Sequence, residues 1–242
     1  MNERNIPETS EDTNELEELV PPKSSGKVIK RLALFLLWLL LAVVVSMKAY
    51  SLGFDYGAKE GKNFKKPVIY AYGYDSIDVT LNFDENTKLT CAYPVYDGHW
   101  HFNMKSDKFI GVDRAYDYLY YEAVSTDDFD LSQGFCVKRE DTITFLEDAL
   151  RKMGLNDRES NDFITFWLPD MMQHEYNLIS FQNQEYAKFV GLTVNPKPDT
   201  SIRVYMVWKG LEEPVAVEPQ TIECNAFRQG KTIVEWGGTE LK

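Results

Sequence analysis

The chain has 242 residues, and its 44% hydrophobic content is enough for a globular core of ordinary size. Its formal net charge of -12 excludes nucleic acid as a partner, because phosphate binding needs clustered lysine and arginine. Residues 1–31 hold seven acidic and five basic residues, and the chain beyond Lys48 holds 31 acidic and 20 basic residues. The part after Lys48 is therefore acidic in its own right, which favours solubility and leaves a cation or a basic partner open.

Residues 1–27 are rich in Glu, Asp, Thr, Ser, Asn and Pro and contain no aromatic side chain. Such a segment buries too little apolar surface to offset the entropy lost on ordering. It is predicted to be a disordered acidic tail.

An apolar run follows at residues 32–47, LALFLLWLLLAVVVSM, in which Ser46 is the one polar residue. At about 1.5 Å per residue this run reaches about 24 Å, and its flanking residues lengthen it to a predicted membrane-spanning helix at 28–50. Basic residues are concentrated before the run, at Lys23, Lys27, Lys30 and Arg31. The tail is therefore predicted to be cytoplasmic and the C-terminal part extracytoplasmic.

A cleaved signal peptide is the alternative interpretation, with Val44 and Ser46 as small residues before a cleavage site. The apolar run is longer than the usual signal core and its preceding tail is long, so an uncleaved anchor is favoured. An extracytoplasmic location permits a disulfide, but Cys91, Cys136 and Cys224 are odd in number. One disulfide and a buried thiol at Cys91 both stay open.

Residues 51–65 carry glycines at three positions and no clear period, which predicts a juxtamembrane stalk before a folded domain at 66–242. Apolar and polar residues alternate over residues 77–83, and a polar turn follows at 84–87. Leu89, Cys91 and Tyr93 are then expected on the inward face. This pattern predicts a β-hairpin.

Further strands are predicted at 68–72, 99–104, 117–123, 134–138, 176–182, 189–194, 202–208 and 232–236. Two helices interrupt them. Asp141 is expected to cap the first, and Gly154 to end it. The second begins at Asn156 with Glu159 in capping-box spacing, and Pro169 is expected to limit it. The predicted fold class is α+β: a mostly antiparallel sheet or sandwich with two inserted helices, preceded by one transmembrane helix.

Several phrases between Lys66 and Glu240 resemble an uncharacterised family of bacterial extracytoplasmic proteins. The phrases are Lys66-Pro67-Val68-Ile69-Tyr70, Thr90-Cys91-Ala92-Tyr93-Pro94, Trp167-Leu168-Pro169, Tyr176-Asn177-Leu178-Ile179-Ser180-Phe181 and Val234-Glu235-Trp236-Gly237-Gly238. The resemblance implies an extracytoplasmic location and a single domain, and it implies no reaction.

Aromatic residues make up 14% of the chain and crowd around residues 116–121. Tyr118 and Tyr120 are expected to form a flat pair on one strand face, which suits stacking on a sugar ring or a protein contact. Trp236 is a third candidate for ligand binding. Glu122 and Glu235 lie beside aromatic residues and are candidates for a pair of carboxylates, as in a glycan hydrolase.

His99 and His101 flank Trp100 on a predicted strand, so both are expected to face solvent on the same side. Two such imidazoles can contribute to a zinc or copper site. Ordinary surface histidines are the more common outcome, and no cofactor is expected.

The sequence contains no nucleophile elbow, phosphate loop, dinucleotide fingerprint or paired Cys/His motif. The leading hypothesis is a membrane-anchored, non-enzymatic module that binds a glycan or protein of the cell envelope. A cell-wall glycan hydrolase using paired carboxylates and a metal-dependent extracytoplasmic protein are the alternatives.

Overall fold

The computed structural model of this chain describes residues 30–31, 34–37, 40, 61–224 and 227–242. The chain divides into two compact units, residues 1–58 and residues 59–242. In the first unit, residues 34–37 and 40 are helical, and their apolar side chains are exposed. Within the described part of the chain, no helix combines the length and apolar character needed to cross a bilayer. The tail 1–27, most of the predicted span 28–50 and most of the predicted stalk lie outside the described residues.

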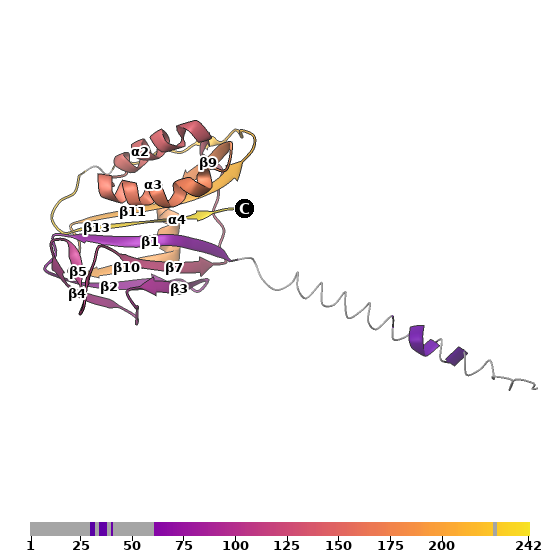
Figure 1. The fold of residues 1–242 in the computed structure, drawn as a ribbon, viewed down its shortest axis with the longest axis horizontal. Coiled ribbons are helices and arrows are strands. Elements are labelled where there is room, and N and C mark those ends of the chain that lie inside the picture. The colour runs from indigo at the N-terminus through magenta and orange to yellow at the C-terminus, as the bar shows by residue number, and fades with distance from the viewer. Residues whose placement is uncertain (1–29, 32–33, 38–39, 41–60, 225–226) are drawn as a thin grey trace, which may run out of the picture. The chain divides into compact units, whose positions relative to one another are not determined.

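In the second unit, the described residues form two sheets and helices in layers (Figure 1). The larger, eight-stranded sheet has the order β12 (Glu218–Pro219), β8 (Gln133–Lys138), β9 (Tyr176–Phe181), β11 (Thr200–Leu211), β13 (Thr232–Glu240), β1 (Lys62–Tyr72), β7 (Leu119–Ser125), β3 (Thr87–Tyr93). The smaller, five-stranded sheet has the order β10 (Val190–Asn195), β2 (Ser76–Phe83), β4 (Trp100–Lys105), β5 (Lys108–Ile110), β6 (Ala115–Tyr116).

Strand pairing is mostly antiparallel, as the sequence predicts. The exceptions among the described strands are β11 with β13 and β8 with β12, which run parallel. A parallel pair needs a crossover connection. In this fold the long segment between β11 and β13 supplies that crossover and passes along the edge of the sheet through β12.

Helices α2 (Thr142–Lys152) and α3 (Asp157–Met171) cover one face of the larger sheet. The Asn156 side chain accepts from the Glu159 backbone N–H at 2.9 Å, and the Glu159 carboxylate accepts from the Asn156 N–H at 2.9 Å. This confirms the predicted capping box. Gly154 has a φ of +94° just after α2, which suits the left-handed end of a helix. Pro169 lies inside α3, so the expectation that it ends the helix is wrong by two residues.

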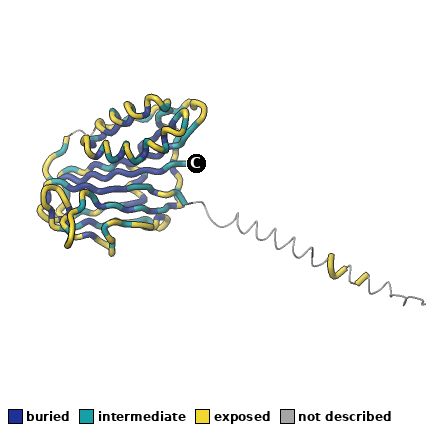
Figure 2. The backbone as a smooth tube through the Cα atoms, in the orientation of Figure 1, coloured by how far each residue is buried: buried dark blue, intermediate teal, exposed yellow. Residues whose placement is uncertain are grey.

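The opposite face of the larger sheet packs against the smaller sheet and α4 (Asn183–Phe189), a helix that the sequence reading did not include. Figure 2 shows buried residues along the central strands and exposed residues on the outer helix surfaces. Phe64 is fully buried in this second core, where its ring lies 5.5 Å from the rings of Tyr186 and Tyr205. Strand β1 begins at Lys62, so the fold extends four residues into the segment predicted as a stalk.

The predicted β-hairpin at residues 77–93 is wrong. A turn does follow β2, but β2 pairs with β10 and β4 in the smaller sheet, whereas β3 pairs with β7 in the larger one. The turn therefore connects the two sheets. Both strands alternate in polarity because each has one face toward the core between the sheets, and alternation does not specify the pairing partner.

The expected inward placement of Cys91 is also wrong. The β3–β7 register shifts between Leu89 and Cys91, which marks a bulge. An extra residue reverses the alternation beyond it, so Leu89 and Ala92 pack on the core while Cys91 and Tyr93 are exposed. The thiols of Cys91, Cys136 and Cys224 are free in the structure, without a disulfide between them.

Candidate functional site

Glu235 lies at the centre of a buried polar cluster between the sheets. Its carboxylate accepts hydrogen bonds from Tyr121 Oη and from Arg203 Nε. Tyr186 Oη contacts Tyr121 Oη, and the centroid of the Tyr186 ring lies 5.1 Å from Cζ of Arg203. Burial, followed by the charge of Glu235, raises the pKa of Tyr121 well above its ordinary value. The side chain of Glu235 is 1% exposed, so this cluster holds the core together and offers no ligand a surface.

Glu122 and Glu235 are not brought together. Glu122 follows Tyr121 in β7, so its side chain lies on the face of the sheet opposite to that of Tyr121 and Glu235. The Tyr120 and Glu122 side chains are hydrogen-bonded to each other, so they lie on the same face of the sheet. Burial, followed by this hydrogen bond, raises the pKa of Tyr120. The sheet itself separates the two carboxylates, and the geometry does not support their pairing in a hydrolase.

Tyr118, Tyr120 and Glu122 do gather on one side of the sheet, beside α3. Lys66 lies among them: its Nζ is 5.4 Å from the centroid of the Tyr118 ring and 6.0 Å from that of Tyr120. The Phe166 ring of α3 is also 5.4 Å from this amine. The Lys66 ammonium group thus packs against the rings of Tyr118 and Tyr120, the pair that the sequence predicted as a ligand-binding surface.

Trp236 is on the same face of the sheet but is fully buried beneath α3, where its ring lies 5.2 Å from that of Phe163. It is a core residue, and its assignment as a ligand-binding residue is wrong. The local sequence pattern could not reveal that a helix covers this residue.

His99 and His101 are exposed on either side of the buried Trp100, as predicted. His101 Nδ1 lies 2.6 Å from Asp78 Oδ1, and this hydrogen bond is the main reason that the pKa of Asp78 falls below its ordinary value. Among the residues that the structure describes, no three His, Cys, Asp or Glu side chains are grouped to hold a metal ion.

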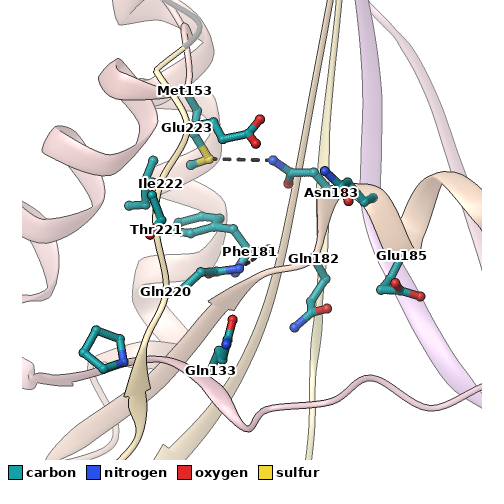
Figure 3. Close-up of a pocket in the computed structure, with 12 residues that line it drawn as sticks. Gln133, Met153, Phe181, Gln182, Asn183, Glu185, Gln220, Thr221, Ile222 and Glu223 are labelled. Atoms are coloured by element: carbon teal, nitrogen blue, oxygen red, sulfur yellow. Dashed lines mark hydrogen bonds between the residues drawn. The ribbon is translucent and has the colours of Figure 1, made fainter.

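A pocket of about 410 Å³ opens at the end of the larger sheet where β9 leads into α4 (Figure 3). Its volume is in the usual range for small-molecule sites. The lining comes from the start of β8, the ends of α2 and β9, the first turn of α4, and β12 with the segment after it. The lining residues are Gln133, Met153, Phe181, Gln182, Asn183, Gln184, Glu185, Pro219, Gln220, Thr221, Ile222 and Glu223.

Several side chains of this amide-lined pocket are fixed by hydrogen bonds to the sheet. The Gln220 amide accepts from the Phe181 N–H at 2.8 Å and donates to the Phe181 carbonyl at 2.7 Å. It thereby pairs with the end of β9 as a neighbouring strand would. Asn183 Oδ1 accepts from the Tyr205 N–H at 2.8 Å, and Gln182 Nε2 donates to the Asp130 carbonyl at 2.8 Å. These bonds hold the walls in place.

The side chains of Gln133, Gln184, Thr221 and Glu223 also line the pocket; they are exposed, and no hydrogen bond joins them to another described residue, so they are available to a ligand in place of solvent. They come from three separate segments of the chain, and Figure 3 shows Gln133 and Glu223 on different walls. Polar side chains from separate segments that gather around one hollow can orient a ligand there.

Two other hollows are larger. One, of about 980 Å³, lies between β8, α2 and residues 215–219 and is more open, so it would enclose less of a small ligand. The other, of about 700 Å³, is rich in lysine, but Lys62 pairs with Asp128 and Lys65 with Glu240. The sequence contained one signal for the amide-lined pocket, the run Gln182-Asn183-Gln184, which reads as a polar loop until the fold brings Gln133 and Thr221 beside it.

Comparisons with known proteins identify no relative: no protein family, no curated protein and no solved structure matches the chain.

Proposed function

We propose that this chain is a single-pass membrane protein whose C-terminal domain, outside the cytoplasm, is a non-enzymatic module that binds a component of the cell envelope. The convergence of unengaged polar groups in the amide-lined pocket is the observation that carries this proposal. The apolar run with basic residues before it supports the anchor and its direction. The exposed apolar side chains at residues 34–37 and 40 are consistent with contact to lipid.

Retention of envelope material tests the binding role. The domain spanning residues 59–242 would be immobilised and exposed to solubilised envelope, beside the double variant Gln133→Ala/Gln184→Ala. Gln173→Ala supplies a matched control, because Gln173 is an exposed glutamine at the end of α3, away from the pocket. We expect the wild type and the control to retain the same component and the double variant to lose it. Equal retention by all three proteins would reject the pocket as the binding site.

The location has its own test. Cys91 and Cys224 are exposed, so a membrane-impermeant maleimide reaches them if the domain is outside the cytoplasm. We expect labelling in spheroplasts that still exclude the reagent from a cytoplasmic control protein. Labelling that requires lysis would place the domain on the other side of the membrane.

A further inference from the structure

We infer that the amide-lined pocket takes an uncharged saccharide. This inference rests on the proposed binding function and specifies the chemistry of its ligand. Three properties of the pocket lead to it: the charge of the lining, the kind of hydrogen-bonding groups that remain unengaged, and the state of the neighbouring strand end.

The charge of the lining disfavours an anion. None of the described lining residues is Lys, Arg or His, and the charged ones are Glu185 and Glu223. Glu185 is already paired with Lys188 at 2.7 Å. A phosphate or carboxylate ligand would enter a site without a cation and beside a carboxylate, which opposes binding.

The unengaged groups match hydroxyls and acetamides. A glutamine amide carries both donors and an acceptor, and the threonine hydroxyl also does both. Sugar hydroxyl groups likewise donate and accept, so each can satisfy the amides of Gln133 and Gln184 in either direction. Ile222 is partly exposed and supplies apolar surface in the same hollow for the C–H face of a sugar ring, whereas Met153 and Phe181 are buried beneath it.

An extended peptide is disfavoured by the state of β9. A peptide that adds to a sheet needs free backbone groups at the strand it joins. At Phe181 both the N–H and the carbonyl are already bonded to the Gln220 side chain. The remaining hydrogen-bonding capacity of the pocket is in side chains, which suits a compact polyhydroxylated ligand.

The test uses the full chain in lipid nanodiscs and calorimetric titration with four probes. Triacetylchitotriose and maltotriose represent neutral saccharides, trigalacturonate carries carboxylates, and tetraalanine amide represents a peptide. We expect binding of at least one neutral saccharide and of neither of the other two probes. Gln133→Ala and Gln184→Ala should each weaken that binding by about tenfold, and Gln173→Ala should not change it.

Glu223→Gln removes the charge that a cationic ligand would need as its counter-ion. An envelope component that is lost in Glu223→Gln but kept in Gln133→Ala and Gln184→Ala would be held by its positive charge, and this result would overturn the saccharide inference. Binding of the trigalacturonate or peptide probe through Gln133 would overturn the saccharide inference and leave the binding function standing. If no probe binds while envelope material is retained through the pocket, the saccharide inference also falls. Retention that is indifferent to the pocket variants removes both.

Discussion

At the scale of single residues, burying Glu235 and Arg203 costs desolvation free energy, which their pairing and their hydrogen bonds offset. Removing two charges from water is unfavourable unless they pair well and their remaining groups are bonded. Here two tyrosine hydroxyls complete the shell of Glu235, and Arg203 Nη2 also donates to the Val190 carbonyl at 2.8 Å. Burial alone would lower the pKa of Arg203, but the charge of Glu235 raises it on balance. Arg203 therefore keeps its charge inside the core.

Glu235→Gln removes one charge of this pair and leaves the guanidinium group buried without a counter-charge. We expect a loss of about 3 kcal/mol in the free energy of unfolding, measured by urea titration. Glu240→Gln at the end of the same strand is the control, because its partner Lys65 is partly exposed. That pair should contribute less than about 1 kcal/mol. Equal losses for the two variants would contradict the role assigned to the buried pair.

Alternation predicted the exposed faces of His99 and His101 correctly and the face of Cys91 wrongly, and it carries no information on what covers a face. Glu235 and Trp236 are neighbours in β13 and both are buried, so neither is placed to contact a ligand as the sequence predicted. The layers that bury them, α3 on one side and the smaller sheet on the other, belong to segments distant in sequence. Gln133 of the pocket was not predicted for the same reason, since its neighbours there lie between 20 and 90 residues further along the chain.

At the scale of elements, the beginning of α3 is fixed by local and distant contacts together. Glu159 is fully buried and closes the capping box, and its carboxylate also accepts from the Tyr72 hydroxyl at 2.6 Å. Arg228, from the crossover between β11 and β13, pairs with the same carboxylate and donates to the Gly154 carbonyl at 3.1 Å. The start of one helix thus anchors the segment that also forms a wall of the pocket.

Asn156→Ala removes the cap of α3 while leaving the pair of Glu159 and Arg228 in place. We expect the free energy of unfolding to fall by about 1 kcal/mol, the usual cost of losing such a cap. Asn161→Ala is the matched control: the residue is exposed on the same helix, and alanine has the higher helix propensity. Chemical denaturation of both variants decides the point, and an unchanged Asn156→Ala protein would contradict the importance of the cap.

The positions of strands and helices were more predictable from the sequence than the pairing between strands. Period-two alternation found most of the strands, and helical spacing with caps found α2 and α3, because both signals are local. The pairing of β2 and β3 with different sheets depends on contacts with β10 and β7, and the bulge at Leu89 leaves no mark in the pattern. The same non-local dependence explains why the fold class was predictable and the pocket was not.

At the scale of the whole molecule, buried tyrosines limit stability at high pH. Burial raises the pKa of Tyr74 to about 12 and raises the pKa of Tyr121, Tyr186 and Tyr205 well above the ordinary value of 10.0. Below pH 10 these groups keep their protons in both states, so the stability linked to them is fully present. As the pH rises further, the unfolded chain loses protons first, and that stability is lost.

We therefore expect the domain to unfold cooperatively above pH 10, with each such tyrosine lowering the free energy of unfolding by up to about 1.4 kcal/mol per pH unit. Circular dichroism and tyrosinate absorbance, recorded together against pH, should change in one transition. Ionisation of all 12 tyrosines of residues 59–242 with the fold intact at pH 12 would contradict the burial of these side chains.

The boundary of the folded unit gives a second prediction at this scale. A fragment starting at residue 66 lacks the first part of β1 and the buried ring of Phe64. Loss of a buried phenylalanine alone costs about 3–5 kcal/mol, a large share of the stability of a domain. We expect residues 59–242 to unfold cooperatively and residues 66–242 to be less stable by at least about 3 kcal/mol. Comparable urea midpoints would show that the first part of β1 is dispensable.

Strand β1 lies between β13 and β7, with an antiparallel neighbour on each side. It is also the strand that continues directly from the N-terminal segment. Tension on that segment therefore acts along an interior strand, where the hydrogen bonds to both neighbours resist together instead of opening one after another from an edge. If the domain is tethered through this segment, as we propose, its lifetime under load should be set by the rate of shearing β1 out of the sheet.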